Sequence, residues 1–385
     1  MTAVDALFDA LEKAGIEARF VGGCVRDKVL GRADEKTEID LAVDKPPEAV
    51  MRALDAADIK VVPTGLKHGT VTAIIKGRPF EITTLRRDVE TDGRHAVVAF
   101  TDDWLEDAKR RDFTFNALYA DRAGTIWDPF DGRADLLAGR VRFIGDPDQR
   151  IAEDRLRVLR FFRFHAWFGK PPMDAAGFDA CRRNAAALGA LSGERVRKEL
   201  LRTLAAPAGA DAADAMLEAG VLDHWLPEYA GSARLRSLIA REDKPDGLRR
   251  LAAILPSAAD ATAIGKRLKL STQESLRLQL MLDPDHAVDA ENLRASLYRL
   301  GTSLFIDRVL LDAPGDWRAA LALAHRWTLP ALPISGGDAL ALGLKPGPKV
   351  GALLEAVERW WIAGDFAADR AACLAELKRL ADGQA

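Results

Sequence analysis

The amino-acid pattern changes near residue 145, and this change limits the folds that the chain can adopt. Before that point, short stretches rich in β-branched residues alternate with stretches in which apolar residues have helical spacing. After it, strand patterns fade, and Ala, Leu and Arg at helical spacing dominate between Pro-rich or Gly-rich breaks. The sequence therefore predicts an α+β head, with a mixed sheet and helices, followed by an all-helical remainder.

Two pairs of strand-like stretches in the head share turn residues, and each pair predicts a hairpin. The first pair is 69–77 and 78–86, and the second lies within 118–130 with its turn at 122–124. Further strands and helices follow from the same patterns. The expected strands are 18–23 and 38–44, and the expected helices are 25–32 and 47–57.

Composition excludes several classes of protein. No apolar stretch reaches the roughly 18–20 residues that span a bilayer, and the N-terminal segment is typical of an amphipathic helix rather than a signal peptide. We therefore expect a cytoplasmic protein with no membrane partner. The three cysteines are far apart and the six histidines show no metal-binding spacing, while a net charge of -3 argues against a general nucleic-acid coat.

A Gly-Gly pair lies where the first strand is expected to turn into a helix. Gly22 and Gly23 allow backbone N–H groups to approach an anion closely, and the positive end of the helix dipole favours the same charge. Arg26, one turn into the helix, adds a charge-assisted contact to a phosphate. A plain turn is the alternative interpretation of the two glycines alone.

Paired carboxylates follow in the segment Glu38-Ile39-Asp40. On a strand, residues i and i+2 point to the same face, so Glu38 and Asp40 would project together and repel each other unless a cation lies between them. Such pairs hold Mg²⁺ beside a substrate phosphate. Glu81, on another expected strand, is a further candidate ligand. A solvated strand edge would explain the same residues.

Two further segments combine cations with hydrogen-bonding groups. In residues 110–116, Arg111, Asp112 and Asn116 suit a triphosphate and a ribose hydroxyl, although a basic helix end is the alternative. In residues 153–163, we expect one helix on which Asp154 and Arg157 present acceptor and donors side by side, as the edge of a base requires. Arg160 and Arg163 continue this stripe, and a surface helix with ion pairs remains the alternative.

The chain resembles the bacterial CCA-adding tRNA nucleotidyltransferases, in the class that also contains bacterial poly(A) polymerases. The resemblance spans most of the chain, and its strongest motifs lie in residues 18–169. These motifs are VGGCVRDKVLGR, EIDLAVD, HGTVTAII, FEITTLRRDVETDGRHA, RRDFTFNAL and IAEDRLRVLRFFRF. The segments LSGERVRKELLRTL and ISGGDALALGLKPGPKVGALL resemble the helical regions of the family.

The resemblance implies a head with the DNA polymerase beta-like nucleotidyltransferase fold, then a helical neck, body and tail. We expect the head at 1–142, the neck with its nucleotide-reading helix at 143–205, the body at 206–325 and a tRNA-binding tail at 326–385. The segment 87–95 falls where the family has a flexible loop used in switching from CTP to ATP. Its presence favours a full CCA enzyme over one that adds only the final A.

The resemblance also implies a role for each site residue. Gly23 and Arg26 would contact the triphosphate, and the two-carboxylate motif would bind catalytic Mg²⁺. Arg111 would contact the nucleotide and Asp112 would sense the ribose. The nucleotide-reading residues would be Asp154 and Arg157, with Arg160 and Arg163 on phosphates. The implied activity is template-independent addition of CCA to the tRNA 3′ end from CTP and ATP, with release of pyrophosphate.

One residue departs from the family pattern, which has Asp-x-Asp where this chain has Glu38-Ile39-Asp40. Magnesium demands near-octahedral geometry, so the extra methylene of Glu38 must be absorbed by a rotamer or backbone shift. Three alternatives to a full CCA enzyme remain open. They are a poly(A) polymerase of the same class, an enzyme that adds only CC, and an inactive RNA-binding protein that keeps the fold.

Overall fold

The computed structural model describes residues 2–34, 37–91, 96–257, 259–312 and 315–383. Its contacts divide the chain into two compact units. The first unit contains residues 1–232 with 266–269, and the second contains residues 233–265 with 270–385. The four domains expected from the sequence are not tested by this division and stay a prediction.

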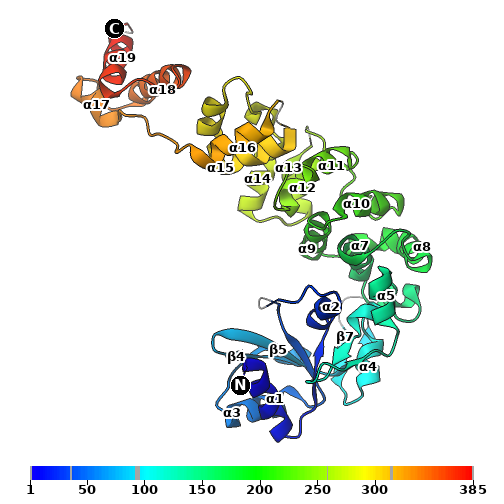
Figure 1. Ribbon diagram of the computed structural model, residues 1–385. Helices are drawn as coiled ribbons and strands as arrows, with labels where there is room; N and C mark the ends of the chain where they lie inside the picture. Colours follow the sequence, from blue (N-terminus) through cyan, green and yellow to red (C-terminus); the bar gives the residue numbers. More distant parts are fainter. Residues whose placement is uncertain (1, 35–36, 92–95, 258, 313–314, 384–385) are drawn as a thin grey trace. The chain divides into compact units, whose positions relative to one another are not determined.

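A seven-stranded mixed sheet forms the first part of the first unit (Figure 1). Its strands are β1 Ala18–Val21, β2 Asp40–Val43, β3 Lys60–Gly65, β4 Thr70–Ile75, β5 Arg78–Thr84, β8 Tyr119–Ala120 and β9 Ile126–Trp127. The strand order is β3-β4-β5-β2-β1-β8-β9, in which β2 and β5 are parallel and every other neighbouring pair is antiparallel. Both predicted hairpins, β4–β5 and β8–β9, are confirmed.

Two further strands, β6 Arg86–Thr91 and β7 Ala96–Phe100, form a separate antiparallel hairpin. The segment 87–95, which the family resemblance equates with a flexible loop, falls on this hairpin. Its first part belongs to β6, and residues 92–95 lie outside the described part of the chain. The role expected for this segment stays a prediction.

The two faces of the sheet follow from the alternation of side chains along β2. Leu41 and Val43 pack into an apolar cluster with helices α1 Ala3–Lys13 and α3 Pro47–Ala56. Ala42 points the other way, into a cluster that includes Tyr119. Because Asp40 is two residues from Ala42, its side chain lies on this second face, opposite α1 and α3.

Strand β2 is shorter than the sequence predicts. The expected strand at 38–44 begins at Asp40, and Glu38 lies before it in an irregular, exposed segment. The expectation that Glu38 and Asp40 share a strand face is therefore wrong. The strand begins at Asp40 because the paired residues of β1 and β5 set its length, with Asp40 opposite Glu81 and Leu41 opposite Phe20.

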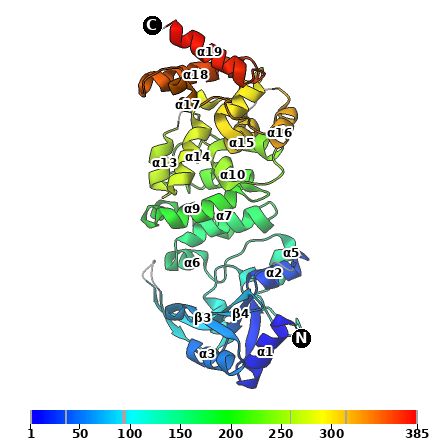
Figure 2. The same ribbon diagram turned by 90° about the vertical axis from the view of Figure 1, so that its left-hand side faces the viewer.

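Helices make up the rest of the first unit. They are α2 Gly23–Val29, α4 Trp104–Lys109, α5 Gly132–Ala138, α6 Pro147–Glu153, α7 Leu156–Phe168, α8 Ala175–Asn184, α9 Gly193–Leu204 and α10 Gly209–Glu218. Helices α7 and α9 lie side by side (Figure 2). Edge-on aromatic contacts hold α7 against residues 113–115. The ring centroid of Phe164 lies 5.4 Å from that of Phe113 and 5.3 Å from that of Phe115.

The helix expected across residues 153–163 is interrupted, so this expectation is wrong in part. Helix α6 ends at Glu153, Asp154 is extended with φ −149° and ψ 105°, and α7 begins at Leu156. The Asp154 carboxylate accepts a hydrogen bond from the Leu156 amide at 3.1 Å. A side chain that binds the first free amides of a helix stabilises a helix start, and here it favours a break over a continuous helix.

The second unit contains helices and connecting loops, and no strand, among its described residues. Its helices are α11 Ala233–Ile239, α12 Gly247–Ala253, α13 Ala261–Arg267, α14 Thr272–Leu282, α15 Leu293–Asp312, α16 Trp317–Arg326, α17 Gly336–Ala341, α18 Pro348–Ala363 and α19 Arg370–Asp382. The predicted α+β head followed by helices is thus confirmed. Within the described ranges, every helix is too short or too polar to cross a membrane.

Gly132 supports the segment that carries the central site residues. A Cβ at this position would lie 2.2 Å from the Thr114 carbonyl oxygen and 2.8 Å from the Phe115 amide nitrogen, and neither backbone atom can move freely. We expect Gly132→Ala to lower the free energy of unfolding by about 1–3 kcal/mol, as overpacking typically does. Denaturant titration followed by circular dichroism would measure this loss.

Gly336→Ala is the matched control for this prediction. No atom lies within 4 Å of a Cβ at Gly336, which is in α17. Since alanine favours a helix over glycine by up to about 1 kcal/mol, this variant should be at least as stable as the unaltered protein. Equal stabilities for the two variants would contradict the close packing at Gly132.

Candidate active site

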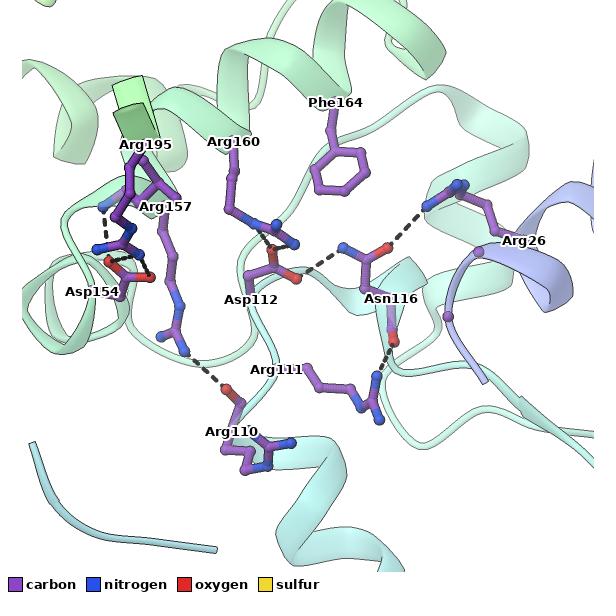
Figure 3. Close-up of a pocket in the computed structure, with 13 residues that line it drawn as sticks. Arg26, Arg110, Arg111, Asp112, Asn116, Asp154, Arg157, Arg160, Phe164 and Arg195 are labelled. Atoms are coloured by element: carbon purple, nitrogen blue, oxygen red, sulfur yellow. Dashed lines mark hydrogen bonds and ion pairs between the residues drawn. The ribbon is translucent and has the colours of Figure 1, made fainter. Parts of the chain in front are cut away.

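An open cavity of about 450 Å³ in the first unit brings together most of the predicted nucleotide-binding residues (Figure 3). It is lined by Gly22, Gly23, Arg26, Arg110, Arg111, Asp112, Asn116, Asp154, Leu156, Arg157, Arg160, Phe164 and Arg195. Six of these side chains are guanidinium groups and two are carboxylates. This excess of positive charge suits a polyanion such as a nucleoside triphosphate.

The Gly-Gly turn forms one end of the cavity. Strand β1 ends at Val21, and Gly22 has φ +71° and ψ −122°, a conformation that strongly favours glycine. Helix α2 then begins at Gly23, so that Arg26 follows on the next turn. The predicted strand-turn-helix is confirmed, and both glycines and Arg26 line the cavity.

A chain of hydrogen bonds crosses the floor of the cavity (Figure 3). Asp112 is buried, and its carboxylate accepts from Arg160 Nε at 2.6 Å and from Asn116 Nδ2 at 2.8 Å. The Asn116 amide oxygen in turn accepts from Arg26 Nη1 at 3.3 Å. Burial alone would raise the pKa of Asp112, but Arg160 and Asn116 stabilise the carboxylate and hold the pKa below its usual value. The site therefore contains a fixed anion between two arginines.

Arg111 is held by residues that the sequence analysis did not single out. The buried Asp107 carboxylate accepts from Arg111 Nη2 at 2.9 Å, from Arg110 Nε at 3.0 Å and from the Tyr119 hydroxyl at 2.6 Å. Burial opposes ionisation, yet the two arginines and Tyr119 keep the pKa of Asp107 well below its usual range. The sequence could have predicted these ion pairs, because Asp107 precedes Arg110 and Arg111 by three and four residues at a helix end.

The acidic cluster consists of Asp40 on β2, Glu81 on β5 and Glu38 just before β2. It lines no part of this cavity. Asp40 pairs in register with Glu81, and burial, Glu81 and Glu38 together raise the pKa of Asp40 to about 6. A carboxylate in this position is stabilised by a bound cation, so Asp40 and its neighbours suit a metal. In the described part of the chain, His, Cys, Asp and Glu residues form no group of three arranged to hold a metal. Glu38 and Glu81 as ligands stay predictions.

Asp154 and Arg157 both line the cavity, but each has other partners. The Asp154 carboxylate accepts from Arg195 Nη2 at 2.8 and 3.0 Å, a contact from α9 that the sequence analysis missed. Arg157 donates to Glu153 at 2.6 Å and to the Arg110 carbonyl at 2.9 Å. The cavity therefore has an acceptor and a donor group at one end, each held in place from a different direction (Figure 3).

Arg163 lies outside the cavity although its stripe partners Arg157 and Arg160 line it. It donates to the buried Glu199 carboxylate of α9 and lies over the Phe164 ring, 4.0 Å from the ring centroid. Its predicted contact with the nucleotide stays a prediction. Three other residues that line the cavity were not predicted from the sequence, because the proposed binding motifs were assigned to the residues beside them. They are Arg110, Leu156 and Phe164.

Comparisons with known proteins agree with this geometry. Residues 18–142 match the family profile described as the poly A polymerase head domain, and residues 173–232 match one described as a probable RNA and SrmB-binding site of polymerase A. The mitochondrial CCA tRNA nucleotidyltransferase 1 of Danio rerio is 33% identical over 92% of this chain and 85% of its own. The CCA-adding enzyme of Levilactobacillus brevis is 30% identical over 96% of this chain and 95% of its own.

A solved structure extends the similarity to the whole fold. The crystal structure of the Bacillus stearothermophilus CCA-adding enzyme in complex with CTP aligns with a TM-score of 0.81 at 27% sequence identity, covering 100% of this chain and 99% of that one. The resemblance stated from the sequence motifs is therefore confirmed. On these similarities over nearly its full length, the chain belongs to the family of CCA-adding tRNA nucleotidyltransferases.

Proposed function

We propose that this protein adds the 3′-terminal CCA to tRNA, without a nucleic-acid template, from CTP and ATP and with release of pyrophosphate. The observation that carries the proposal is the arginine-lined cavity, which has a Gly-Gly helix start at one end and Asp154 beside Arg157 at the other. Its volume and charge suit a nucleotide whose triphosphate lies at the glycines and whose base lies at the Asp/Arg end.

Nucleotide choice follows from the order of donors and acceptors at the base end. Cytosine and adenine both present an amino group next to an unprotonated ring nitrogen, whereas uracil and guanine present a carbonyl next to a ring N–H. The Asp154 carboxylate can accept from the amino group, and Arg157 can donate to the ring nitrogen. A uracil or guanine in this place would set donor against donor and acceptor against acceptor, and would lose the hydrogen bonds that cytosine and adenine make.

The remaining residues position the sugar and the phosphates. Asp112 and Asn116 lie where a ribose hydroxyl can donate to the carboxylate and accept from the amide. Arg26, Arg111 and Arg160 supply charge along the triphosphate, which is how proteins assist phosphoryl transfer with little covalent work.

We assign the magnesium ions that such a reaction requires to Asp40, with Glu38 and Glu81 as the further candidate ligands. When bound there, magnesium would activate the tRNA 3′-hydroxyl and neutralise charge at the α-phosphate. The proposal is supported by the raised pKa of Asp40, since its like-charged neighbours destabilise the carboxylate unless a cation is present. Arg111, which faces Asp40, provides a further positive charge on this side of the site.

The decisive experiment is nucleotide addition to tRNA transcripts that lack CCA, CA or only the final A, with Mg²⁺ and with CTP, ATP or both. We expect two C residues, then one A, then a stop. Addition that ends after CC in the presence of ATP would assign an enzyme that adds only CC. Long A-tails on any RNA would instead assign a poly(A) polymerase, and tRNA binding without addition would assign an inactive binding protein.

A further inference from the structure

A second cavity, of about 390 Å³, lies beside the first and is not used by the proposed reaction. Its walls come from α2 and the turn after it, from the C-terminal half of α7, and from α9. Four arginines line it, together with two aromatic rings: Arg26, Arg32, Arg163, Arg202, Trp167 and Phe168. Arg26 lines both cavities, so the two are neighbours on either side of one guanidinium group.

The positive charge of this second cavity is only partly neutralised. Arg163 is paired with Glu199, and Arg26 Nε lies 3.4 Å from Asp27, which also lines the cavity. Among the residues that the structure describes, neither Arg32 nor Arg202 has a carboxylate partner. Two guanidinium groups thus remain free to bind an anion, and both are exposed to solvent.

The aromatic rings fix the arginines rather than offer a free stacking surface. The Arg26 guanidinium lies 4.5 Å and that of Arg32 5.7 Å from the Phe168 ring centroid, so cations already face this ring. Trp167 donates its indole N–H to the Arg202 carbonyl at 3.0 Å, which ties α7 to α9 at the edge of the cavity. The arrangement favours a compact phosphate over a nucleobase.

One atom of Arg26 marks the passage between the cavities. Its Nε is buried and makes no hydrogen bond in the described ranges of the chain, although the Asp27 carboxylate lies 3.4 Å away as an ion-pair partner. A buried donor without a hydrogen bond is destabilised, so an arriving phosphate oxygen that accepts from it would be favoured at this position. Arg26 also lies at the Gly-Gly end of the first cavity, which the proposed function gives to the outer phosphates of the substrate.

We propose that the second cavity binds the pyrophosphate that leaves the reaction, with Arg32 and Arg202 as its free ligands. The inference rests on the proposed function for the source of the anion. When the tRNA 3′-oxygen bonds to the α-phosphorus, its hydroxyl proton passes to water, the bond from that phosphorus to the bridging oxygen breaks, and pyrophosphate keeps the electron pair of that bond. The multiply charged product then lies at Arg26, beside two guanidinium groups that have no other anion to bind.

Calorimetric titration of pyrophosphate into protein saturated with CTP and Mg²⁺ tests this directly, without any turnover. With CTP in the first cavity, the unaltered protein should bind one further pyrophosphate. The double variant Arg32→Ala, Arg202→Ala should bind it roughly tenfold or more weakly, because two charge-assisted contacts are lost. The affinity for CTP should not change. Pyrophosphate that merely competes with CTP, or that binds the double variant equally well, would overturn the proposal.

Lys198→Ala is the matched control, since it removes a charge from the exposed side of α9 without touching either cavity. It should bind pyrophosphate as the unaltered protein does. In a nucleotide-addition assay, the double variant should also resist inhibition by pyrophosphate. If its KM for tRNA rose instead and inhibition stayed unchanged, the cavity would hold an RNA strand and the proposal would be wrong.

Failure of the proposed function remains distinguishable from failure of this inference. A protein that adds no nucleotide but binds pyrophosphate beside CTP would lack the activity while keeping the anion site. A protein that adds CCA normally but binds no second pyrophosphate would have the activity without the site.

Discussion

Asp40→Asn should abolish nucleotide addition and, at the same time, stabilise the metal-free protein. The amide keeps the shape of the side chain but is a poor magnesium ligand, so we expect addition to fall by about 1000-fold or more. Binding of tRNA should persist, because Asp40 lies in the acidic cluster on β2 and β5 and not among the arginines. Single-turnover incorporation of labelled CTP would measure the loss.

The stabilisation follows from burial and from the like charges of Glu81 and Glu38, which raise the pKa of Asp40 from its ordinary value of 3.8 to about 6. The folded state therefore binds the proton more tightly than the unfolded state does, and ionised Asp40 destabilises the fold. This cost is fully present above about pH 6 and disappears as the pH falls toward 4. After allowance for partial exposure, the amide should gain roughly 1–2 kcal/mol at pH 8, about a third of that at pH 4.5 and almost nothing below about pH 3.5.

Thermal unfolding in EDTA at several pH values would measure this gain. Asp55→Asn, at an exposed position on α3, is the control and should match the unaltered protein in both activity and stability. A stability difference that did not change with pH would mean that the ionised Asp40 carboxylate does not destabilise the fold. Near-normal turnover in Asp40→Asn would remove Asp40 from the catalytic machinery.

Features set by local backbone requirements could be predicted from the sequence. A strand followed by two glycines and an amphipathic segment specified the turn at Gly22, whose positive φ favours glycine. Stretches rich in β-branched residues around a shared Gly-containing turn specified β4 and β5, and helical spacing specified the helices after residue 145. In each case, the deciding residues lie within a few positions of one another.

Features set by distant partners could not be predicted in this way. Strand β2 begins at Asp40 because of its pairing with β5, about 40 residues along the chain. Asp154 is held by Arg195, which comes from another helix. Arg163 lies away from the first cavity because Glu199 draws its guanidinium group toward α9. Only the helix break after Glu153 was readable locally, since an aspartate whose carboxylate binds a nearby backbone amide competes with a continuous helix.

Asp154→Asn should change which nucleotide the enzyme accepts. The carboxylate has only acceptor oxygens, whereas the amide can present a donor at the same place. Addition of C and A should fall by about 100-fold in kcat/KM, equivalent to about 2.7 kcal/mol. Addition of U should rise relative to C, because the new N–H can donate to the uracil carbonyl. Parallel assays with the four nucleoside triphosphates, on tRNA that lacks CCA, would measure both changes.

Arg157→Ala would be a less clean test of the same model. The guanidinium of Arg157 donates to Glu153 and to the carbonyls of Arg110 and Arg150, so its removal would also loosen α7 from α6 and from the segment after α4. Asp154→Asn preserves the size of the side chain and one of the two hydrogen bonds from Arg195, and the ion pair that it removes is partly exposed, with the Arg195 side chain 38% accessible. The change therefore acts on the acceptor more than on the fold.

Arg195→Lys tests whether nucleotide choice depends on the orientation of the Asp154 carboxylate or on its hydrogen-bond acceptors. Arg195 reaches both Asp154 oxygens from one nitrogen, Nη2, and lysine keeps the positive charge but has a shorter side chain without the fixed directions of a planar guanidinium group. We expect this variant to retain the preference for C and A while its KM for both nucleotides rises. If Arg195→Lys relaxed selectivity as much as Asp154→Asn, orientation alone would set the choice. If Asp154→Asn left selectivity unchanged, base reading would lie elsewhere in the cavity.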